Sequence, residues 1–128
     1  MITEKRITGN KGEKAVCKYL KKQGCKIIKR NFSCKLGEID IIAENKEYIL
    51  FVEVKTRSTG QMLPPREAVG YKKRSKILKT AQFFLKKYDK DKQPRFDIAE
   101  VFLDDKGKMS INYFDNAFAQ ESKNYAAF

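Results

Sequence analysis

The sequence has 128 residues and contains no histidine and no tryptophan. The absence of histidine excludes the Ser-His-Asp and Cys-His forms of nucleophilic catalysis. A structural zinc site is not expected either, because such sites use mainly cysteine and histidine, and the three cysteines show no Cys-x-x-Cys spacing. Any general base must therefore be a carboxylate, a lysine or a metal-bound hydroxide. We expect Cys17, Cys25 and Cys34 to be free thiols in a reducing compartment.

Long apolar runs are missing as well. No run approaches the roughly 20 residues that a membrane-spanning helix needs, and Met1 to Arg6 lack the apolar core of a signal peptide. These absences predict a cytoplasmic protein without a membrane partner. Because 41% of the residues are hydrophobic and 34% are charged, we expect one folded domain over residues 1–128, with a loosely held tail after about residue 120.

Acidic residues are scarce, since 28 lysines and arginines outnumber 16 aspartates and glutamates and give a formal net charge of +12. The excess is uneven along the chain. Residues 1–35 carry 11 basic and 2 acidic side chains, residues 66–95 carry 11 and 3, and residues 36–58 carry 3 and 5. Basic segments on both sides of an acidic one suit a phosphate backbone next to a divalent cation. The alternative is a lysine-rich surface that serves only solubility.

The acidic segment has the pattern of a β-hairpin, because two apolar runs flank the polar turn at residues 44–47. Asp40, Glu53 and Lys55 are set into these runs, where an unpaired charge would be costly. Alternation of side chains places Glu53 and Lys55 on one face, and folding about the turn brings Asp40 close to residues 51–53. We therefore predict that Asp40, Glu53 and Lys55 converge at the open end of the hairpin.

These three residues have the composition of a magnesium site. Mg²⁺ prefers hard oxygen ligands and usually takes one or two protein carboxylates, with water and phosphate oxygens completing the octahedron. Asp40, Glu53 and the Val54 carbonyl could supply them, while Lys55 would orient the attacking water or stabilise the hydroxide. Glu13, on the apolar face of the first predicted helix, is a candidate third carboxylate or only a first-turn glutamate that complements the helix dipole. For Glu53 and Lys55 the alternative is a structural ion pair at a strand end.

The rest of the chain predicts two helices and three further strands. The first helix begins near Thr8 or Asn10, either of which could cap it. The second helix runs from about Arg66, or from Lys72 where the pattern is clearer, to Tyr88. Strands are expected over residues 25–32, 95–103 and 109–114. This order indicates an α/β protein with a mixed sheet of about five strands flanked by helices.

Two features place a nucleic-acid backbone near the predicted site. The loop at residues 58–65 leaves directly from that site and is a candidate substrate-facing loop. The second helix carries a basic stripe that is separate from its apolar stripe. Lys72 and Lys76 in this stripe, and Arg57 at the end of the central strand, are the candidate backbone contacts.

The hairpin motifs resemble those of a nuclease superfamily. Gly37-Glu38-Ile39-Asp40 followed by Phe51-Val52-Glu53-Val54-Lys55-Thr56-Arg57 is similar to the PD-(D/E)xK motif, with Ile39 in the place of the proline. More closely, the chain resembles the YraN-like family of small bacterial proteins described as endonucleases, which are similar in fold to archaeal Holliday junction resolvases. The resemblance covers most of the chain and includes Gly12-Glu13, Tyr19-Leu20, Arg30-Asn31-Phe32, Glu67-Ala68-Val69, Arg95-Phe96-Asp97 and Asn116-Ala117-Phe118.

The resemblance implies a restriction-endonuclease-like fold, with Mg²⁺ as the cofactor and Mn²⁺ as a substitute. It implies metal ligands at Asp40 and Glu53, a catalytic lysine at Lys55, an accessory acid at Glu13 and a substrate-side group at Lys73. DNA, branched or damaged, is the implied substrate. A homodimer would suit the cutting of two strands.

The sequence leaves three hypotheses open. The first is a Mg²⁺-dependent DNA endonuclease that hydrolyses phosphodiester bonds. The second is a nucleic-acid-binding module that uses a nuclease fold without cutting. The third is a partner-binding subunit whose acidic residues are structural.

Overall fold

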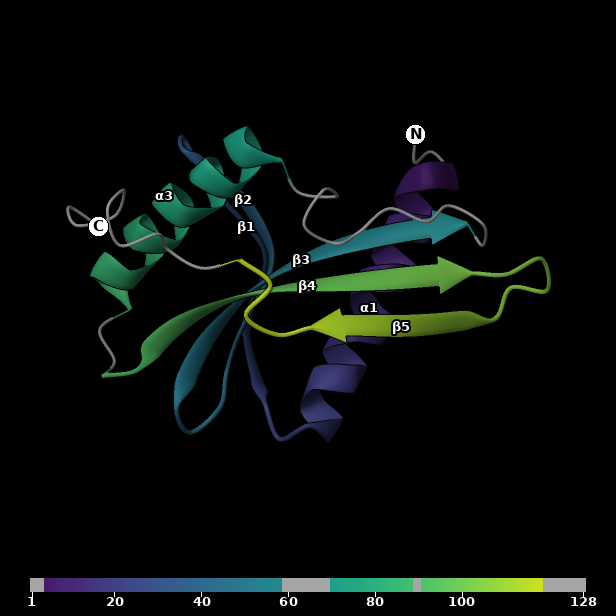
Figure 1. Ribbon diagram of the computed structural model, residues 1–128, viewed down its shortest axis with the longest axis horizontal. Helices are drawn as coiled ribbons and strands as arrows, with labels where there is room; N and C mark the ends of the chain where they lie inside the picture. Colours follow the sequence, from purple (N-terminus) through teal and green to yellow (C-terminus); the bar gives the residue numbers. More distant parts are fainter. Residues whose placement is uncertain (1–3, 59–69, 89–90, 119–128) are drawn as a thin grey trace.

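The computed structural model describes residues 4–58, 70–88 and 91–118 of the chain. A five-stranded sheet in the order β1-β2-β3-β4-β5 packs against two helices (Figure 1). Only β3 and β4 are parallel, and α3 connects them, so the sheet is mixed, as the sequence predicted. The elements in chain order are α1 (Glu4–Lys22), β1 (Lys26–Cys34), β2 (Gly37–Glu44), β3 (Tyr48–Ser58), α3 (Tyr71–Lys87), β4 (Gln93–Leu103) and β5 (Met109–Phe114).

Each helix covers one face of the sheet, because the central strands bury side chains on both sides. Phe51 of β3 packs in one hydrophobic cluster with Leu78 of α3. Leu50, the preceding residue in the strand, packs in the other cluster with Val16 of α1. A strand that is buried on both faces reads as a continuous apolar run. Strand β4 is also buried on both faces, so its sequence does not alternate cleanly between apolar and polar residues.

Helix α1 begins at Glu4, so the predicted start at Thr8 or Asn10 was wrong. The helix continues past both candidate caps, and Gly12 within it has a packing role. A Cβ atom at Gly12 would collide with the side-chain hydroxyl of Thr56 in β3. Glycine therefore lets α1 approach the sheet closely, at a cost of about 1 kcal/mol in helix propensity relative to alanine.

The other boundaries differ from the predictions by a few residues. Gly24, with a φ of 88°, follows α1 as a helix-ending glycine does. Strand β1 lies at the edge of the sheet and continues to Cys34. Helix α3 begins at Tyr71, next to the predicted start at Lys72. The alternative start at Arg66, most of the proline-containing loop and the C-terminal tail lie outside the described residues.

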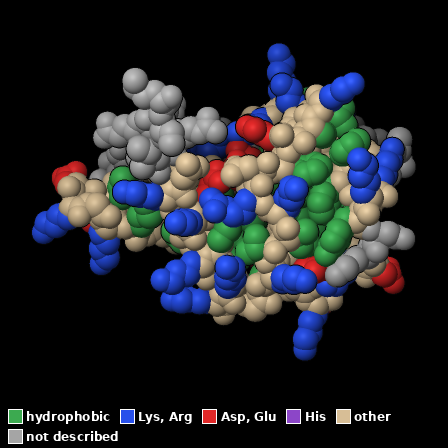
Figure 2. Space-filling model, turned by 180° about the vertical axis from the view of Figure 1, so that it is seen from behind, with side chains coloured by type: hydrophobic (Ala, Val, Ile, Leu, Met, Phe, Trp, Pro, Cys, Tyr) green, Lys and Arg blue, Asp and Glu red, His purple; other side chains and the backbone are tan. Residues whose placement is uncertain are grey.

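Three further features bear on the sequence predictions. Cys17, Cys25 and Cys34 are free, and the first two are buried. Neither α1 nor α3 is long and apolar enough to cross a membrane. Seen from behind (Figure 2), the molecule presents lysine and arginine side chains over much of its surface and only a few acidic side chains. The positive charge counted in the sequence is therefore spread widely over this face.

The predicted hairpin is formed by β2 and β3. In its turn, the Asn45 side chain accepts hydrogen bonds from the backbone N–H groups of Glu47 and Tyr48, at 2.9 and 2.8 Å. An asparagine that bonds the following backbone in this way stabilises a tight turn. The turn sets the register of the two strands and hence the positions of the polar residues near their other ends.

Candidate functional site

The β2–β3 ladder ends next to the polar residues that the sequence singled out. Its last antiparallel pair is Ile41↔Val52, and beyond it the Asp40 carboxylate accepts a hydrogen bond from the Val54 N–H at 2.8 Å. A side chain thus satisfies a backbone donor where the two strands separate. The negative charge of Glu53 acts on Asp40, so the two carboxylates lie close together. The structure brings them together, as the register predicted.

Glu53 lies at the buried centre of a small charge cluster. The residue is 5% exposed, and its Oε1 atom lies 2.6 Å from Lys73 Nζ and 3.8 Å from Lys55 Nζ. Lys55 follows Glu53 in β3, whereas Lys73 comes from the first turn of α3. The Lys73 side chain is 45% exposed. One buried carboxylate therefore faces two ammonium groups, of which the closer one is on a half-exposed side chain.

Asp40 holds its proton more tightly than an ordinary aspartate. Burial, followed by the negative charge of Glu53, raises the pKa of Asp40 from 3.8 to about 6. The hydrogen bond from Val54 and the positive charge of Lys73 oppose this rise without cancelling it. Shifts with this cause are concentrated at functional sites.

The two lysines respond differently to the same surroundings. Burial, together with the nearby Lys73 ammonium, lowers the pKa of Lys55. Burial also acts against the charge of Lys73, but the contact with Glu53 outweighs it and raises the pKa of Lys73. Lys73 is consequently a permanent cation at this site, while Lys55 can more easily become a neutral amine.

Glu13 lies in the third turn of α1, because the helix begins at Glu4. The interpretation of Glu13 as a first-turn glutamate was therefore wrong. Its Oε1 atom lies 3.4 Å from Nη2 of Arg30 in β1. Burial, followed by the charge of Asp40, raises the pKa of Glu13. Glu13 thus leans toward the carboxylate pair but is held by Arg30.

The residues at this site fit a divalent cation held by two carboxylates. Mg²⁺ usually takes one or two protein carboxylates, and Asp40 and Glu53 form such a pair. Among the residues that the structure describes, no three histidine, cysteine, aspartate or glutamate side chains are grouped as metal ligands would be. Glu13 is not a third member of the group in this arrangement. Coordination of a metal by Glu13, and also by Asp40 and Glu53, stays a prediction.

A groove of about 390 Å³ adjoins the carboxylate pair on the α3 side. It is lined by Gly37, Glu38, Lys72, Lys73, Lys76 and Ile77. The groove thus brings together Lys72, Lys73 and Lys76, which are three of the candidate backbone contacts. Lys72 and Lys76 are exposed and can be reached by a ligand. Gly37, with a φ of 153°, lets β2 begin close to α3, because a Cβ atom there would come within 3.0 Å of Thr80 Oγ1.

Arg57 differs from the other candidate contacts. Its side chain is 13% exposed, and its Nε atom lies 3.1 Å from Oε2 of Glu100. Glu100 in β4 is only 3% exposed, so the pair neutralises a buried charge between parallel strands. Sequence reasoning did not find this pair, because α3 separates the two strands along the chain. A substrate contact at Arg57 stays a prediction beside this structural contact.

A second buried acid, Asp97, was also missed. It is 0% exposed and accepts hydrogen bonds from Arg95 Nε at 3.0 Å, from the Tyr113 hydroxyl at 2.5 Å and from the Asn116 N–H at 2.9 Å. Ala117 N–H also donates to the Phe96 carbonyl at 2.8 Å. The last two segments that carried the family resemblance, around residues 96 and 117, are thus hydrogen-bonded to each other. A signal was present in the sequence, because the predicted strands 95–103 and 109–114 are separated by a short turn, and their antiparallel pairing brings the two segments together.

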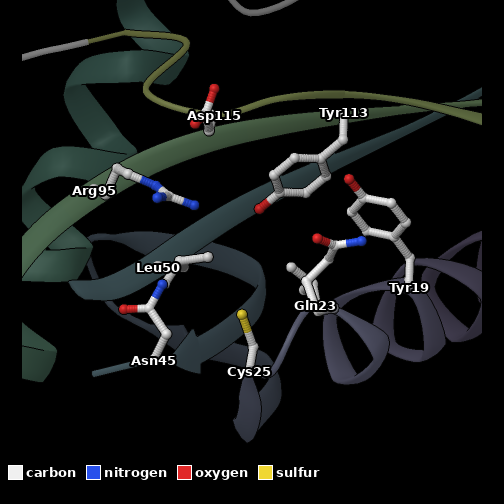
Figure 3. A pocket seen from close by; sticks show the side chains of 9 residues that line it. Tyr19, Gln23, Cys25, Asn45, Leu50, Arg95, Tyr113 and Asp115 are labelled. Carbon is white, nitrogen blue, oxygen red and sulfur yellow. The ribbon is translucent and has the colours of Figure 1, made fainter. Parts of the chain in front are cut away.

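A hollow of about 360 Å³ is lined in part by two residues that contact Asp97, namely Arg95 and Tyr113 (Figure 3). Its lining includes Tyr19 of α1, Asn45 of the hairpin turn, and both Arg95 and Tyr113. Arg95 and Tyr113 already donate to Asp97, so their polar groups are part of the structural network. The hollow lies toward the turn of the hairpin, whereas the carboxylate pair lies toward its open end.

Comparison with solved structures matches the chain to SfsA from Pyrococcus furiosus in complex with Ca²⁺. The TM-score is 0.39 and the sequence identity 18%, over 89% of this chain and 64% of the SfsA chain. The chain thus spans slightly less than two thirds of that protein. At this level of similarity the match carries no argument about function.

Similarity to curated relatives is much higher. A UPF0102 protein from Caldanaerobacter subterraneus subsp. tengcongensis is 47% identical over 118 residues, which cover 89% of this chain and 96% of the relative. UPF0102 proteins from Clostridium acetobutylicum and Clostridioides difficile are 46% and 44% identical, over 86% of this chain and 92% and 95% of their own lengths.

The sequence profile described as "Uncharacterised protein family UPF0102" matches residues 12–101 of the chain. This stretch contains Glu13, Asp40, Glu53, Lys55 and Lys73. It therefore includes both strands of the hairpin and the first turn of α3. The chain belongs to family UPF0102, the YraN family, in agreement with the resemblance of its hairpin motifs to the PD-(D/E)xK nuclease superfamily.

Proposed function

We propose that this protein is a metal-dependent endonuclease that hydrolyses phosphodiester bonds in DNA. The observation that carries the proposal is the pair formed by half-buried Asp40 and buried Glu53, with Lys55 and Lys73 beside it. Burial, followed by the charge of Glu53, raises the pKa of Asp40, as expected at a site that favours a divalent cation. Mg²⁺ is the expected metal and Mn²⁺ its substitute, held by Asp40 and Glu53.

Each residue has a role that follows from its surroundings. A bound metal would lower the pKa of a coordinated water and shield the charge of the phosphate. The lowered pKa of Lys55 suits an amine that orients the attacking water and accepts its proton. Water oxygen bonds to phosphorus, the bond from phosphorus to the leaving sugar oxygen breaks, and that oxygen takes a proton from solvent. Lys73, half exposed, can turn from Glu53 toward a phosphate.

DNA is favoured as the substrate because the groove next to the site contains three lysines. Lys72, Lys73 and Lys76 can hold a phosphate backbone in register with the carboxylate pair. Branched DNA as the preferred form is a finer part of the proposal, supported by the family resemblance. A homodimer would place two such sites on two strands. The cytoplasm is the location that we propose for this activity.

The test is cleavage of plasmid, single-stranded and four-way-junction DNA in Mg²⁺, Mn²⁺ or EDTA. We expect cleavage with either metal, none in EDTA, and a loss of roughly a thousandfold or more in Glu53→Gln. Glu44→Gln is the matched control, because Glu44 is equally buried at 5% and is held by Lys92 near the turn of the hairpin. Equal cleavage by Glu53→Gln, or no metal-dependent cleavage of any of the three DNAs, would contradict the proposal.

A nucleic-acid-binding module that does not cut is the second candidate, and one contact favours it. Lys73 lies 2.6 Å from Glu53 and supplies a counter-charge without a metal. Such a module would bind DNA with an affinity that falls with salt and does not depend on Mn²⁺. The nuclease should bind DNA more tightly with Mn²⁺, and Asp40→Asn should remove this increase. DNA affinity in the wild type and this variant, with and without Mn²⁺, therefore separates the two functions.

A further inference from the structure

A second basic groove lies on the other face of the sheet, between α1 and β1. It measures about 270 Å³ and is lined by Lys14, Cys17, Lys18, Lys21, Ile27 and Arg30. Four of these six side chains are cationic and none is acidic. We call it the α1–β1 groove. It is separate from the groove of Lys72 and Lys76, because α1 and α3 pack against opposite faces of the sheet.

The three lysines of the α1–β1 groove form a row along one side of α1. Lys14, Lys18 and Lys21 are four and three residues apart, so they follow one side of the helix. Seven helical residues rise about 10 Å, so the row is long enough to lie along several phosphates of one DNA strand, which follow one another at about 3.4 Å along the axis. All three lysines are exposed. Within the described ranges, no carboxylate forms an ion pair with any of them.

Arg30 distinguishes this groove from an ordinary solvated face of a helix. It projects from β1, so the positive charge comes from two elements that enclose a hollow. Its side chain is 35% exposed and lines the groove, while its Nη2 atom lies 3.4 Å from Oε1 of Glu13. An anion in the groove would therefore meet positive charge from both α1 and β1.

The α1–β1 groove also adjoins the proposed catalytic centre. Arg30 contacts Glu13 at 3.4 Å, and Glu13 lies close enough to Asp40 to interact with its charge. Cys17 and Ile27 supply an apolar floor on which a sugar could pack. The face shown in Figure 2 carries abundant lysine and arginine and few acidic side chains. A polyanion that reaches the catalytic centre would therefore meet favourable charge along this face as well.

We infer that the α1–β1 groove binds a nucleic-acid phosphate backbone, as a contact segment additional to Lys72 and Lys76. The inference takes its substrate class, DNA, from the proposed function. An anionic membrane fits less well, because the site is concave and membrane-binding helices expose large apolar side chains. Within the described part of the chain, the exposed large apolar side chains are Leu36 and Tyr71, and neither lines the groove.

The test measures binding of duplex DNA in Ca²⁺, which replaces Mg²⁺ to suppress cleavage, over a range of KCl concentrations. The variant Lys14→Gln/Lys18→Gln removes two charges from the groove. The matched control, Lys46→Gln/Lys86→Gln, removes two charges from exposed lysines in the hairpin turn and at the end of α3. The plot of log affinity against log salt has a negative slope, and each lost phosphate contact reduces the magnitude of this slope by about 0.9. We expect the magnitude of the slope to fall by about two in the groove variant and to change little in the control.

Lysine acylation with mass spectrometry provides a second measurement that does not depend on variants. DNA should protect Lys14, Lys18 and Lys21 from acylation and leave Lys46 reactive. An unchanged salt slope in the groove variant, equal losses in both variants, or no selective protection would overturn the inference. So would a groove variant that loses binding to anionic phospholipid vesicles but keeps full DNA affinity.

The two proposals fail in distinguishable ways. Metal-dependent cleavage by the wild type, with an unchanged slope in Lys14→Gln/Lys18→Gln, would overturn the groove inference alone. A reduced slope and selective protection in a protein that never cuts DNA would support the groove inference and overturn only the proposed nuclease activity.

Discussion

The sheet buries acidic residues in two contrasting ways. Asp97 is 0% exposed and accepts hydrogen bonds from Arg95, Tyr113 and the Asn116 backbone. In the carboxylate pair, Asp40 accepts one backbone hydrogen bond, and Glu53 relies for its closest contact on a lysine that is 45% exposed. The difference teaches that burial alone does not indicate function. An acid whose partners are few or movable retains capacity for a ligand, whereas a fully bonded acid holds the fold together.

The largest expected effect concerns the fully bonded acid. Asp97→Asn should lower the free energy of unfolding by about 3 to 5 kcal/mol, because the Arg95 guanidinium loses its buried counter-charge. Urea unfolding at neutral pH measures this change. The double variant Asp97→Asn/Arg95→Met should recover part of the loss, since it leaves no unpaired charge. A loss below about 1 kcal/mol in the single variant would show that the Asp97 network does not hold the fold.

Asp40→Asn, the corresponding substitution in the carboxylate pair, should raise the free energy of unfolding instead of lowering it. A carboxyl group whose pKa is raised by folding destabilises the folded state once it ionises. The stability of the wild type should therefore fall as the pH rises from about 4 to about 6, through the pKa of Asp40. Asp40→Asn should remove this dependence and stabilise the metal-free protein at pH 7 by on the order of 2 to 3 kcal/mol, at 1.36 kcal/mol per pKa unit.

Denaturation in EDTA at pH 4 and pH 7 measures the effect of Asp40→Asn. The difference between variant and wild type should be small at the lower pH and large at the higher one. A variant that is less stable than the wild type at pH 7 would mean that Asp40 is a satisfied structural acid like Asp97, and the contrast between the two regions would fail.

Tyr113 tests the Asp97 network with a smaller change. Burial, followed by the charge of Asp97, raises the pKa of Tyr113, so its hydroxyl stays protonated and donates to the carboxylate. Tyr113→Phe should cost about 2 kcal/mol, the range of a hydrogen bond to a charged group. Thermal unfolding measures this loss. Tyr71→Phe is the control, because Tyr71 is 68% exposed, and an equal loss in both variants would contradict the role given to Tyr113.

Lys73 should give the smallest effect on stability. An ion pair with a half-exposed lysine contributes little, so Lys73→Ala should change the free energy of unfolding by less than about 1 kcal/mol. The same variant should bind Mn²⁺ more tightly, because it removes a cation that competes for Glu53. Lys72→Ala, which alters the neighbouring exposed lysine, is the control. Weaker Mn²⁺ binding by Lys73→Ala would show that the lysine supports the metal rather than competing with it.

The sequence predicted the carboxylate pair because the contact depends on local rules. A short turn joins β2 and β3, and strand alternation then fixes which residues face each other. Asp40 and Glu53 could thus be placed together before any coordinates were known. The mixed sheet also followed from the order of elements, whereas the parallel pairing of β3 with β4 came only from the structure.

The contacts that sequence reasoning missed are those between distant segments. The pairing of Glu100 with Arg57 depends on the register of β3 and β4, which no short turn connects. Thr8 and Asn10 were predicted as caps of α1, but the helix continues past both, and Gly12 packs against Thr56 on another element. Local patterns contain no information about such tertiary contacts, and these override the intrinsic propensities of the chain.

The central claim is that Asp40 and Glu53 together bind a divalent cation. Mn²⁺ binding to the protein without DNA tests this claim most directly. Titration calorimetry compares the wild type with Asp40→Asn, Glu53→Gln and the control Glu44→Gln. The account predicts that the wild type and Glu44→Gln bind Mn²⁺ alike and that both site variants lose this binding. Equal Mn²⁺ affinity in all four proteins, or no binding by the wild type, would contradict it.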